Sequence, residues 1–129
     1  MLAIDTNLLV RIVANDEPEQ VRRAAALFEA EQIFVPKTVL LETEWVLRYA
    51  YKLDSSAIAH ALRAIAGLSN VTLENPAELA LALGWFESGL DFADALHLAS
   101  SLRAGRFATF DIKFAQRAQA LTEIEIVQA

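Results

Sequence analysis

Two aspartates come directly after short apolar runs that are typical of buried strands. Asp5 follows residues 2–4 (LAI), and Asp111 follows residues 107–110 (FATF). Ligands bind beyond the carboxyl ends of the strands in open α/β sheets, so both side chains are candidates for a site at that edge. Each aspartate also precedes a predicted helix, and capping of that helix would explain either residue alone. The coincidence of two such acids at one sheet edge favours a shared site.

Two glutamates lie close together in a strongly apolar helix predicted for residues 38–51. Glu44 has Arg48 four residues later, and a surface ion pair between them accounts for it. Glu42 has no basic residue at the same spacing. Its neighbours three and four residues away are Thr38, Val39, Trp45 and Val46. A carboxylate on such a face is costly unless a charged group compensates it, which makes Glu42 a candidate ligand. The alternative is a glutamate that reaches solvent beside bulky residues.

Two further aspartates open a helix predicted for residues 91–104. Asp91 and Asp94 are three residues apart, so both side chains turn toward one side of the helix. Acids at a cap and in a first turn also interact favourably with the helix dipole, and this alternative applies most directly to Asp91. Small and apolar residues follow Asp94 and would bury the helix against the sheet. His97 either orients a carboxylate or is a partly buried histidine without a functional role.

These acids come from separate elements and offer only oxygen as a ligand. Oxygen donors suit hard cations such as Mg²⁺ or Mn²⁺, whereas the absence of cysteine and the presence of only two histidines disfavour zinc and copper. Carboxylates that repel one another need such cations in order to coexist. The sequence therefore predicts a site for a hard divalent cation.

The elements that position the acids alternate between short strands and helices. Strands are predicted at residues 2–4, 33–35, 70–74, 107–110 and 124–127. Helices are predicted after residue 7, at residues 16–31, 38–51, 54–67, 75–89 and 91–104, and after residue 111. Residues 16–19 (DEPE) supply a cap, an early proline and an acidic first turn for the second helix. Such alternation is typical of a short, mainly parallel sheet covered by helices on both faces, within one α/β domain that spans residues 1–129.

Composition excludes several classes of protein. The 129 residues include 17 acidic and 11 basic side chains, a formal charge of −6, and no cysteine, which rules out disulfide scaffolds, thiolate zinc sites and cysteine nucleophiles. No apolar stretch is long enough to span a membrane, and an acid at position 5 is unlike a signal peptide, so a cytoplasmic protein is expected. The acidic total argues against binding of nucleic acid through a general positive field.

The ordered set of motifs resembles the PIN-domain ribonucleases. The motifs are DTN at residues 5–7, VLLETEWVL around Glu42, DFADALHLA at residues 91–99 and TFD at residues 109–111. The residues within these motifs and the length of the chain resemble those of the VapC toxins of bacterial toxin–antitoxin pairs. The resemblance covers essentially the whole chain and implies a PIN-like three-layer α/β fold.

The resemblance also implies roles for individual residues. The metal-binding and catalytic acids that it implies are Asp5, Glu42, Asp94 and Asp111, with Asp91 as an additional metal ligand. Polar positions that support the site by hydrogen bonding are Thr6, Asn7 and Thr109. The family further implies dependence on Mg²⁺ or Mn²⁺, an RNA substrate, a homodimer and a VapB-type antitoxin partner. Basic candidates for RNA binding at the rim are Arg11, Lys37, Arg103, Arg106 and Lys113.

Metal-assisted hydrolysis of phosphodiester bonds is the chemistry that fits this set. One alternative is a Mg²⁺-dependent phosphoacceptor signalling domain, which requires paired acids after the first strand and a lysine after the last. This chain has DTN after its first strand and ends in EIVQA, without a lysine. A second alternative is a catalytically silent PIN-like binding module, against which the complete acid set argues. The apolar helices at residues 38–51 and 76–88 are candidates for a dimer or antitoxin interface, or for core packing.

The charge of the chain has a different meaning if those five acids are ligands. Setting them apart from the 17 acidic residues leaves 12 acids against 11 bases. The excess negative charge is then largely a cation site, and RNA recognition is predicted to depend on metal.

Overall fold

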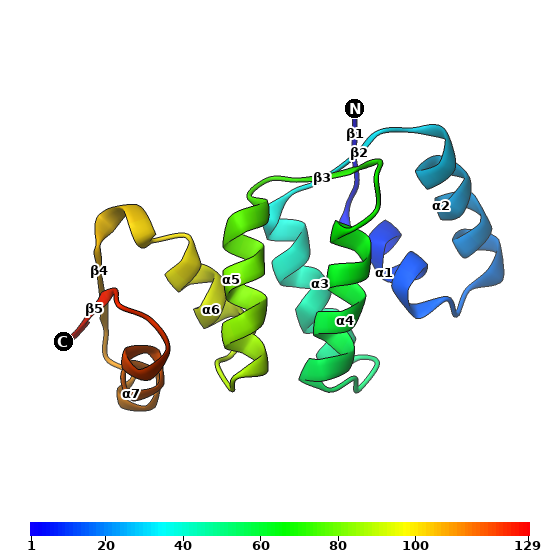
Figure 1. Cartoon of the computed structure of the whole chain (residues 1–129). Helices are drawn as coiled ribbons and strands as arrows, with labels where there is room; N and C mark the ends of the chain where they lie inside the picture. Colours follow the sequence, from blue (N-terminus) through cyan, green and yellow to red (C-terminus); the bar gives the residue numbers. More distant parts are fainter. The chain divides into compact units, whose positions relative to one another are not determined.

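The computed structural model describes residues 1–129, which form seven α-helices, one 3₁₀ turn and five strands (Figure 1). The chain divides into two compact units, Met1–Pro76 and Ala77–Ala129. None of the helices combines the length and apolar character needed to cross a bilayer.

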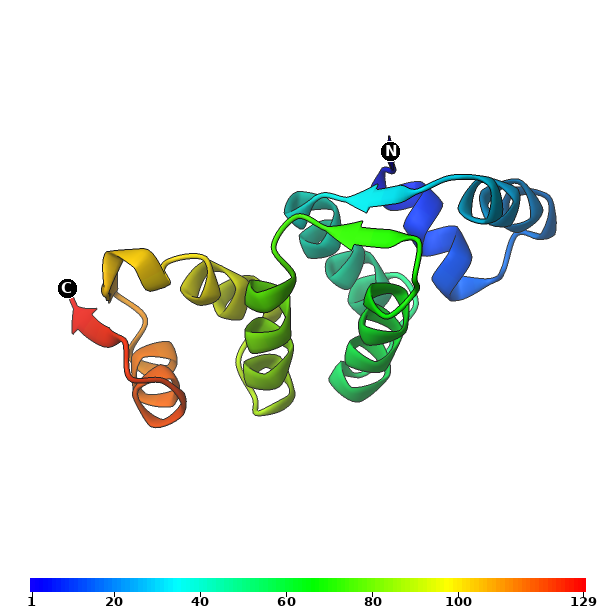
Figure 2. The same ribbon diagram turned by 45° about the horizontal axis from the view of Figure 1, so that its top comes forward.

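The first unit contains a three-stranded parallel sheet and four helices. Its elements are β1 (Leu2–Ala3), α1 (Thr6–Ala14), α2 (Pro18–Ala30), β2 (Ile33–Val35), α3 (Lys37–Tyr49), α4 (Ser55–Ala66) and β3 (Val71–Leu73). The strand order is β1-β2-β3, with Leu2 opposite Ile33 and Ile33 opposite Val71. Figure 2 shows β2 and β3 side by side and pointing the same way. The short parallel sheet expected from the alternation of strands and helices is confirmed.

One face of this sheet carries the core of the first unit. The strands contribute the buried side chains of Ile33, Val35 and Leu73 to it, and Ile4, directly after β1, is buried as well. Helices α1, α3 and α4 lie on one side of the sheet (Figure 1) and supply buried residues such as Leu9, Leu47 and Leu62. Burial of this apolar surface is the main force that holds the strand ends in place, because each strand is only two or three residues long.

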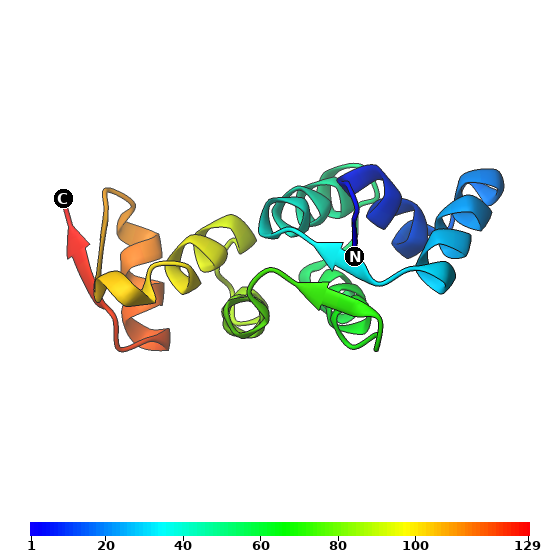
Figure 3. The same cartoon turned by 90° about the horizontal axis from the view of Figure 1, so that it is seen from above.

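The second unit contains a two-stranded parallel sheet and three helices. Its elements are α5 (Pro76–Glu87), α6 (Phe92–Ala99), the 3₁₀ turn η1 (Leu102–Ala104), β4 (Arg106–Thr109), α7 (Ile112–Leu121) and β5 (Glu125–Gln128). Strands β4 and β5 pair in parallel, and Figure 3 shows α7 alongside them. Phe107 of β4 and Phe114 of α7 meet edge to face, with ring centroids 5.6 Å apart. This contact fixes the start of α7 against the strand that precedes it.

The helix predicted for residues 91–104 is shorter in the structure. Helix α6 ends at Ala99, and a separate 3₁₀ turn covers Leu102–Ala104. The Ser101 hydroxyl donates a hydrogen bond of 2.7 Å to the carbonyl of His97, and Gly105 then adopts a φ of 76°. A serine that bonds back to the preceding turn and a glycine in the left-handed region both favour an end to the helix, so the prediction was wrong by about one turn.

Candidate acidic site

The end of β1 leads directly into three of the predicted site residues, at the N-cap and in the first turn of α1. Asp5 is exposed and caps α1, since its Oδ1 accepts a hydrogen bond of 3.1 Å from the backbone N–H of Leu8. Thr6 is buried at 7% exposure, and Asn7 is exposed. Capping alone would explain an aspartate at position 5, so its further role depends on what lies beside it.

Glu42 of α3 is the acid beside this turn. The hydroxyl of Thr6 donates a hydrogen bond to Oε1 of Glu42, joining residues that are 36 positions apart in the sequence. The Glu42 side chain is exposed. The structure thus agrees with the alternative of a glutamate that reaches solvent beside bulky residues, because this side of α3 is exposed. The bond orients the Glu42 carboxylate toward the carboxyl end of β1.

Glu44, expected at the surface, is instead buried. Its side chain is 1% exposed, and its Oε2 lies 2.8 Å from Nε of Arg48, which is 34% exposed. The pairing predicted from the four-residue spacing is confirmed, but its location is not. The buried positions of α3 are Leu40, Thr43, Glu44 and Leu47. These residues face the core, which leaves Glu42 on the solvent side of the helix.

Three acids of the second unit stand at or near helix starts. Asp91 caps α6 and accepts a hydrogen bond from the backbone N–H of Asp94 at 3.4 Å. Asp111 caps α7 and accepts one from the N–H of Phe114 at 3.0 Å. Thr109 supports this turn, because its Oγ1 accepts a hydrogen bond of 3.0 Å from the N–H of Asp111. Asp94 itself is partly buried in the first turn of α6.

The negative charges of Asp91 and Asp111 act on the carboxyl group of Asp94. Burial raises the pKa of Asp94 above its ordinary value, the charges of Asp91 and Asp111 raise it further, and His97 opposes the shift. Raised carboxyl pKa values of this origin are typical of acids gathered for a function, since nothing in folding requires like charges to be close. A cation near Asp94 would relieve this repulsion.

The donor set suits a hard cation, although neither unit closes a metal-binding group. In the first unit, Thr6 is hydrogen-bonded to Glu42. In the second unit, Asp91 and Asp111 are near enough to Asp94 for their charges to raise its pKa. No three acidic or histidine side chains within either unit form a group that could hold a metal ion. All of the candidate ligands are carboxylates, which fits Mg²⁺ or Mn²⁺ and not the softer transition metals.

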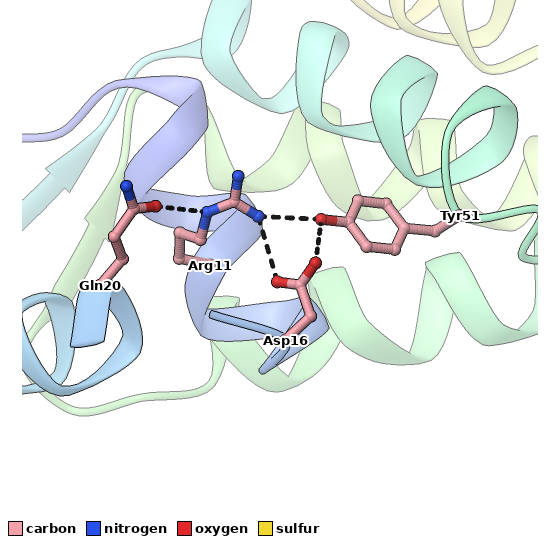
Figure 4. Close-up of polar contacts among 4 residues, drawn as sticks. All are labelled: Arg11, Asp16, Gln20 and Tyr51. Atoms are coloured by element: carbon pink, nitrogen blue, oxygen red, sulfur yellow. Dashed lines mark hydrogen bonds and ion pairs between the residues drawn. The ribbon is translucent and has the colours of Figure 1, made fainter. Parts of the chain in front are cut away.

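Sequence reasoning missed a polar network in the first unit (Figure 4). Nη1 of Arg11 lies 3.1 Å from Oδ1 of Asp16 and donates a hydrogen bond of 2.9 Å to the Tyr51 hydroxyl, which donates one of 2.7 Å to Oδ2 of Asp16. Arg11 Nε also donates to Oε1 of Gln20 at 2.6 Å. The hydrogen bond from Tyr51, supported by the charge of Arg11, lowers the pKa of Asp16.

This network changes two expectations. The N-cap residue of α2 is Glu17, whose side chain makes no capping bond, and Asp16 is turned toward Arg11 and Tyr51 instead. Arg11 was a candidate for RNA binding, but its guanidinium is committed to the network. Arg106, another basic candidate, pairs with Glu125 at 3.0 Å across the two-stranded sheet. Lys113 follows Asp111 by two residues on an exposed surface of α7 and remains a candidate for contact with phosphate.

The family model for the PIN domain matches residues 2–120, a range that includes residues of both units. Proteins with this domain are typically nucleases that use divalent metal ions. No match was found among curated proteins. The match covers nearly the whole chain and all of the candidate acids, and the chain therefore belongs to the PIN-domain family.

Proposed function

We propose that this protein is a Mg²⁺- or Mn²⁺-dependent endoribonuclease that hydrolyses RNA phosphodiester bonds. The observation that carries the proposal is the partly buried carboxyl of Asp94 in the second unit, whose pKa is raised by burial and further by the charges of Asp91 and Asp111. A stable fold has no need of that repulsion, whereas a divalent cation site has. Membership of a family of metal-dependent nucleases supports the same conclusion.

The proposed metal ligands and catalytic acids are Asp5, Glu42, Asp94 and Asp111, with Asp91 as a further ligand. When bound, a divalent cation supplies a more acidic bound water and charge stabilisation at phosphate. The side chains of the protein would hold this cation and keep its carboxylate ligands oriented. Thr6 fixes the rotamer of Glu42, and the helix N-termini fix the carboxylates of Asp5 and Asp111 through the N–H groups of Leu8 and Phe114. Thr109 and Asn7 are proposed to support the adjoining turns.

We further propose that the protein acts in the cytoplasm. The motif phrasing and length resemble VapC toxins, so the protein is proposed to act as the toxin of a toxin–antitoxin pair, to form a homodimer and to be covered by a VapB-type antitoxin. A small upstream reading frame for a DNA-binding antitoxin would support this setting, and its absence would leave a PIN nuclease outside such a pair.

Conservative removal of one carboxylate charge from each unit tests the activity. Asp5→Asn and Asp94→Asn are each expected to lower Mg²⁺-dependent cleavage of single-stranded RNA by more than about 100-fold, since even residues that only orient a metal ligand affect activity by 10- to 100-fold. EDTA should abolish cleavage by the unmodified protein. Retention of cleavage by both purified variants would contradict the assignment.

Asp54→Asn provides a matched control for these variants. Asp54 also caps a helix, accepting a hydrogen bond of 2.8 Å from the N–H of Ala57 at the start of α4, but it is not one of the proposed ligands. Its variant should cleave RNA at the unmodified rate. A folded, unmodified protein that shows no cleavage with Mg²⁺ or Mn²⁺ would favour the catalytically silent binding module instead.

A further inference from the structure

Helix α3 exposes two large aromatic rings that take no part in the core. The side chains of Trp45 and Tyr49 are 56% and 51% exposed. Their ring centroids lie 5.1 Å apart, with the planes tilted by 44°. This distance is typical of an attractive aromatic contact, so the two rings form one continuous apolar surface on the outside of the helix.

The pair is held in place from the buried side of the helix. The guanidinium carbon of Arg48 lies 4.9 Å from the centroid of the Tyr49 ring, within the range of a cation–π contact. Arg48 is in turn fixed by the buried carboxylate of Glu44, with Nε 2.8 Å from Oε2. The aromatic surface is thus attached to a rigid base, and little conformational entropy is lost when a ligand packs on it.

The aromatic surface lies on the same exposed side of α3 as a proposed metal ligand. Glu42, Trp45 and Tyr49 are exposed and follow one another at spacings of three and four residues, which places them in one row along the helix. One helical turn rises about 5.4 Å, so the first ring begins about one turn from Glu42. The rings therefore lie within reach of the bases that neighbour a phosphate held at Glu42.

The size of the surface fits bases better than a second copy of the chain. Two half-exposed rings offer roughly 200 Å² of apolar area, whereas a stable protein interface buries about 800 Å² on each partner. Base stacking on aromatic side chains needs only the area of one or two rings and is the usual way in which proteins bind unpaired nucleotides.

We propose that Trp45 and Tyr49 form a stacking surface for the bases of single-stranded RNA, next to the phosphodiester group that is to be cut. The inference rests on the proposed ribonuclease function for the identity of its ligand. It adds a site for bases beside acids that are proposed to act on the phosphate through a metal ion. Because every base has an apolar face, this surface binds RNA without strong sequence preference.

A comparison of the affinities for two probes of equal charge, one with bases and one without, separates the contribution of base stacking from that of electrostatic attraction. The probes are a 12-nucleotide oligouridine and a 12-residue abasic ribose-phosphate oligomer of equal charge, each measured by fluorescence anisotropy in Ca²⁺, a cation that carboxylates also bind. The unmodified protein is expected to prefer the oligouridine by roughly 5- to 150-fold, the range for one stacked base. Trp45→Leu combined with Tyr49→Leu should remove this preference, while Trp45→Phe should keep most of it.

Leu68→Ala is the control for loss of exposed apolar surface, because Leu68 is 43% exposed in the same unit, and it should leave the preference unchanged. An equal preference in the double leucine variant and the unmodified protein would overturn the proposal, as would the absence of any preference in the unmodified protein. If the double variant instead dissociates an oligomer, as seen by sedimentation, and keeps its preference for bases, the rings belong to a contact between copies of this chain.

The two proposals fail in different ways. Loss of cleavage in Asp5→Asn and Asp94→Asn together with an unchanged base preference in the leucine variant would overturn only the stacking surface. A base preference that depends on Trp45 in a protein without Mg²⁺-dependent cleavage would overturn only the nuclease.

Discussion

Thr6 in α1 and Glu42 in α3 are joined by a hydrogen bond between their side chains, although 36 residues separate them in the sequence. The Thr6 hydroxyl is buried and the Glu42 carboxylate is exposed. A buried donor that holds an exposed carboxylate fixes its orientation at little cost, because the carboxylate keeps its contact with water. Residues from the start of α1 and the middle of α3 therefore act together to position the Glu42 carboxylate.

Removing this hydroxyl should weaken metal binding more than folding. Thr6→Val keeps the shape of the side chain, and the loss of one hydrogen bond is expected to lower the free energy of unfolding by about 1 kcal/mol. The Mg²⁺ concentration for half-maximal cleavage should rise by about 10- to 100-fold, as for other residues that orient a metal ligand. Thr6→Ser keeps the donor and should restore the original value. A Mg²⁺ titration of cleavage that is the same for Thr6→Val and the unmodified protein would show that the bond serves only stability.

Two substitutions at Asp111 separate its role as a helix cap from its role as a carboxylate. Asparagine also caps helices, so Asp111→Asn should change the free energy of unfolding by only a few tenths of a kcal/mol, whereas Asp111→Ala should lower it by about 1 kcal/mol. Cleavage should fall by more than about 100-fold in both variants. Chemical denaturation gives the first quantity and an RNA cleavage assay the second. Cleavage that survives in the asparagine variant would leave Asp111 as a cap alone.

The raised pKa of Asp94 predicts a pH-dependent penalty on stability in the absence of metal. The ordinary pKa of this carboxyl is 3.8, and its folded-state pKa is higher. Well below pH 3.8 the carboxyl is protonated in both the folded and the unfolded state, and no penalty exists. As the pH rises, the unfolded chain ionises first, so the folded state loses stability until its own pKa is passed.

Asp94→Asn should therefore raise the melting temperature in EDTA at pH 7, and not at pH 3. Because Asp94 is only partly buried, solvent screening limits the expected gain to about 1–3 °C. Adding Mg²⁺ should stabilise the unmodified protein and not the variant. Thermal unfolding at the two pH values checks this, and a variant that is less stable at pH 7 in EDTA would show that neither burial nor the neighbouring charges destabilise the Asp94 carboxylate.

Tyr51 is expected to serve stability and not RNA binding. Tyr51→Phe removes the hydroxyl that bonds to both Arg11 and Asp16, and should lower the melting temperature by about 1–3 °C because the network is partly exposed. RNA affinity should stay the same. Tyr49→Phe, which removes a hydroxyl from an exposed ring elsewhere on the unit, should leave the melting temperature unchanged. A loss of RNA affinity in Tyr51→Phe would return Arg11 to the set of residues that contact RNA.

The start of most helices was predictable because the signal is local. Asp5, Asp54 and Asp111 each accept a hydrogen bond from the N–H group three residues later, as their position before an apolar periodic segment indicates. The parallel strands were predictable for a similar reason, since each is a short apolar run between helices. These features depend on residues within one turn of one another.

The faces of α3 were not predictable, because that helix is apolar nearly all around. The spacing correctly paired Glu44 with Arg48, but it gave no indication of which side packs on α1 and α4. That side is set by contacts with helices distant in sequence. Glu44 is consequently buried, although a surface position was expected, and Glu42 is exposed, in agreement with the alternative of a glutamate that reaches solvent.

The network of Arg11, Asp16 and Tyr51 was beyond sequence reasoning for a related reason. Tyr51 lies 40 residues from Arg11 and 35 from Asp16, in a loop with no motif of its own. Local rules assigned Asp16 to the cap of α2 and Arg11 to the surface. The actual partners depend on how the end of α3 approaches the turn between α1 and α2.

The helix caps at the candidate acids bear on how the apoprotein behaves. Asp5, Asp91 and Asp111 each rest on the positive end of a helix, with an N–H group donating to one carboxylate oxygen. Part of the charge of each acid is thus balanced by the backbone itself, and these three helices form without a cation. Chelation is then expected to silence the protein without denaturing it. Newly synthesised chains would fold first and load metal afterwards, so that competition for free divalent ions sets the active fraction while the amount of protein stays constant.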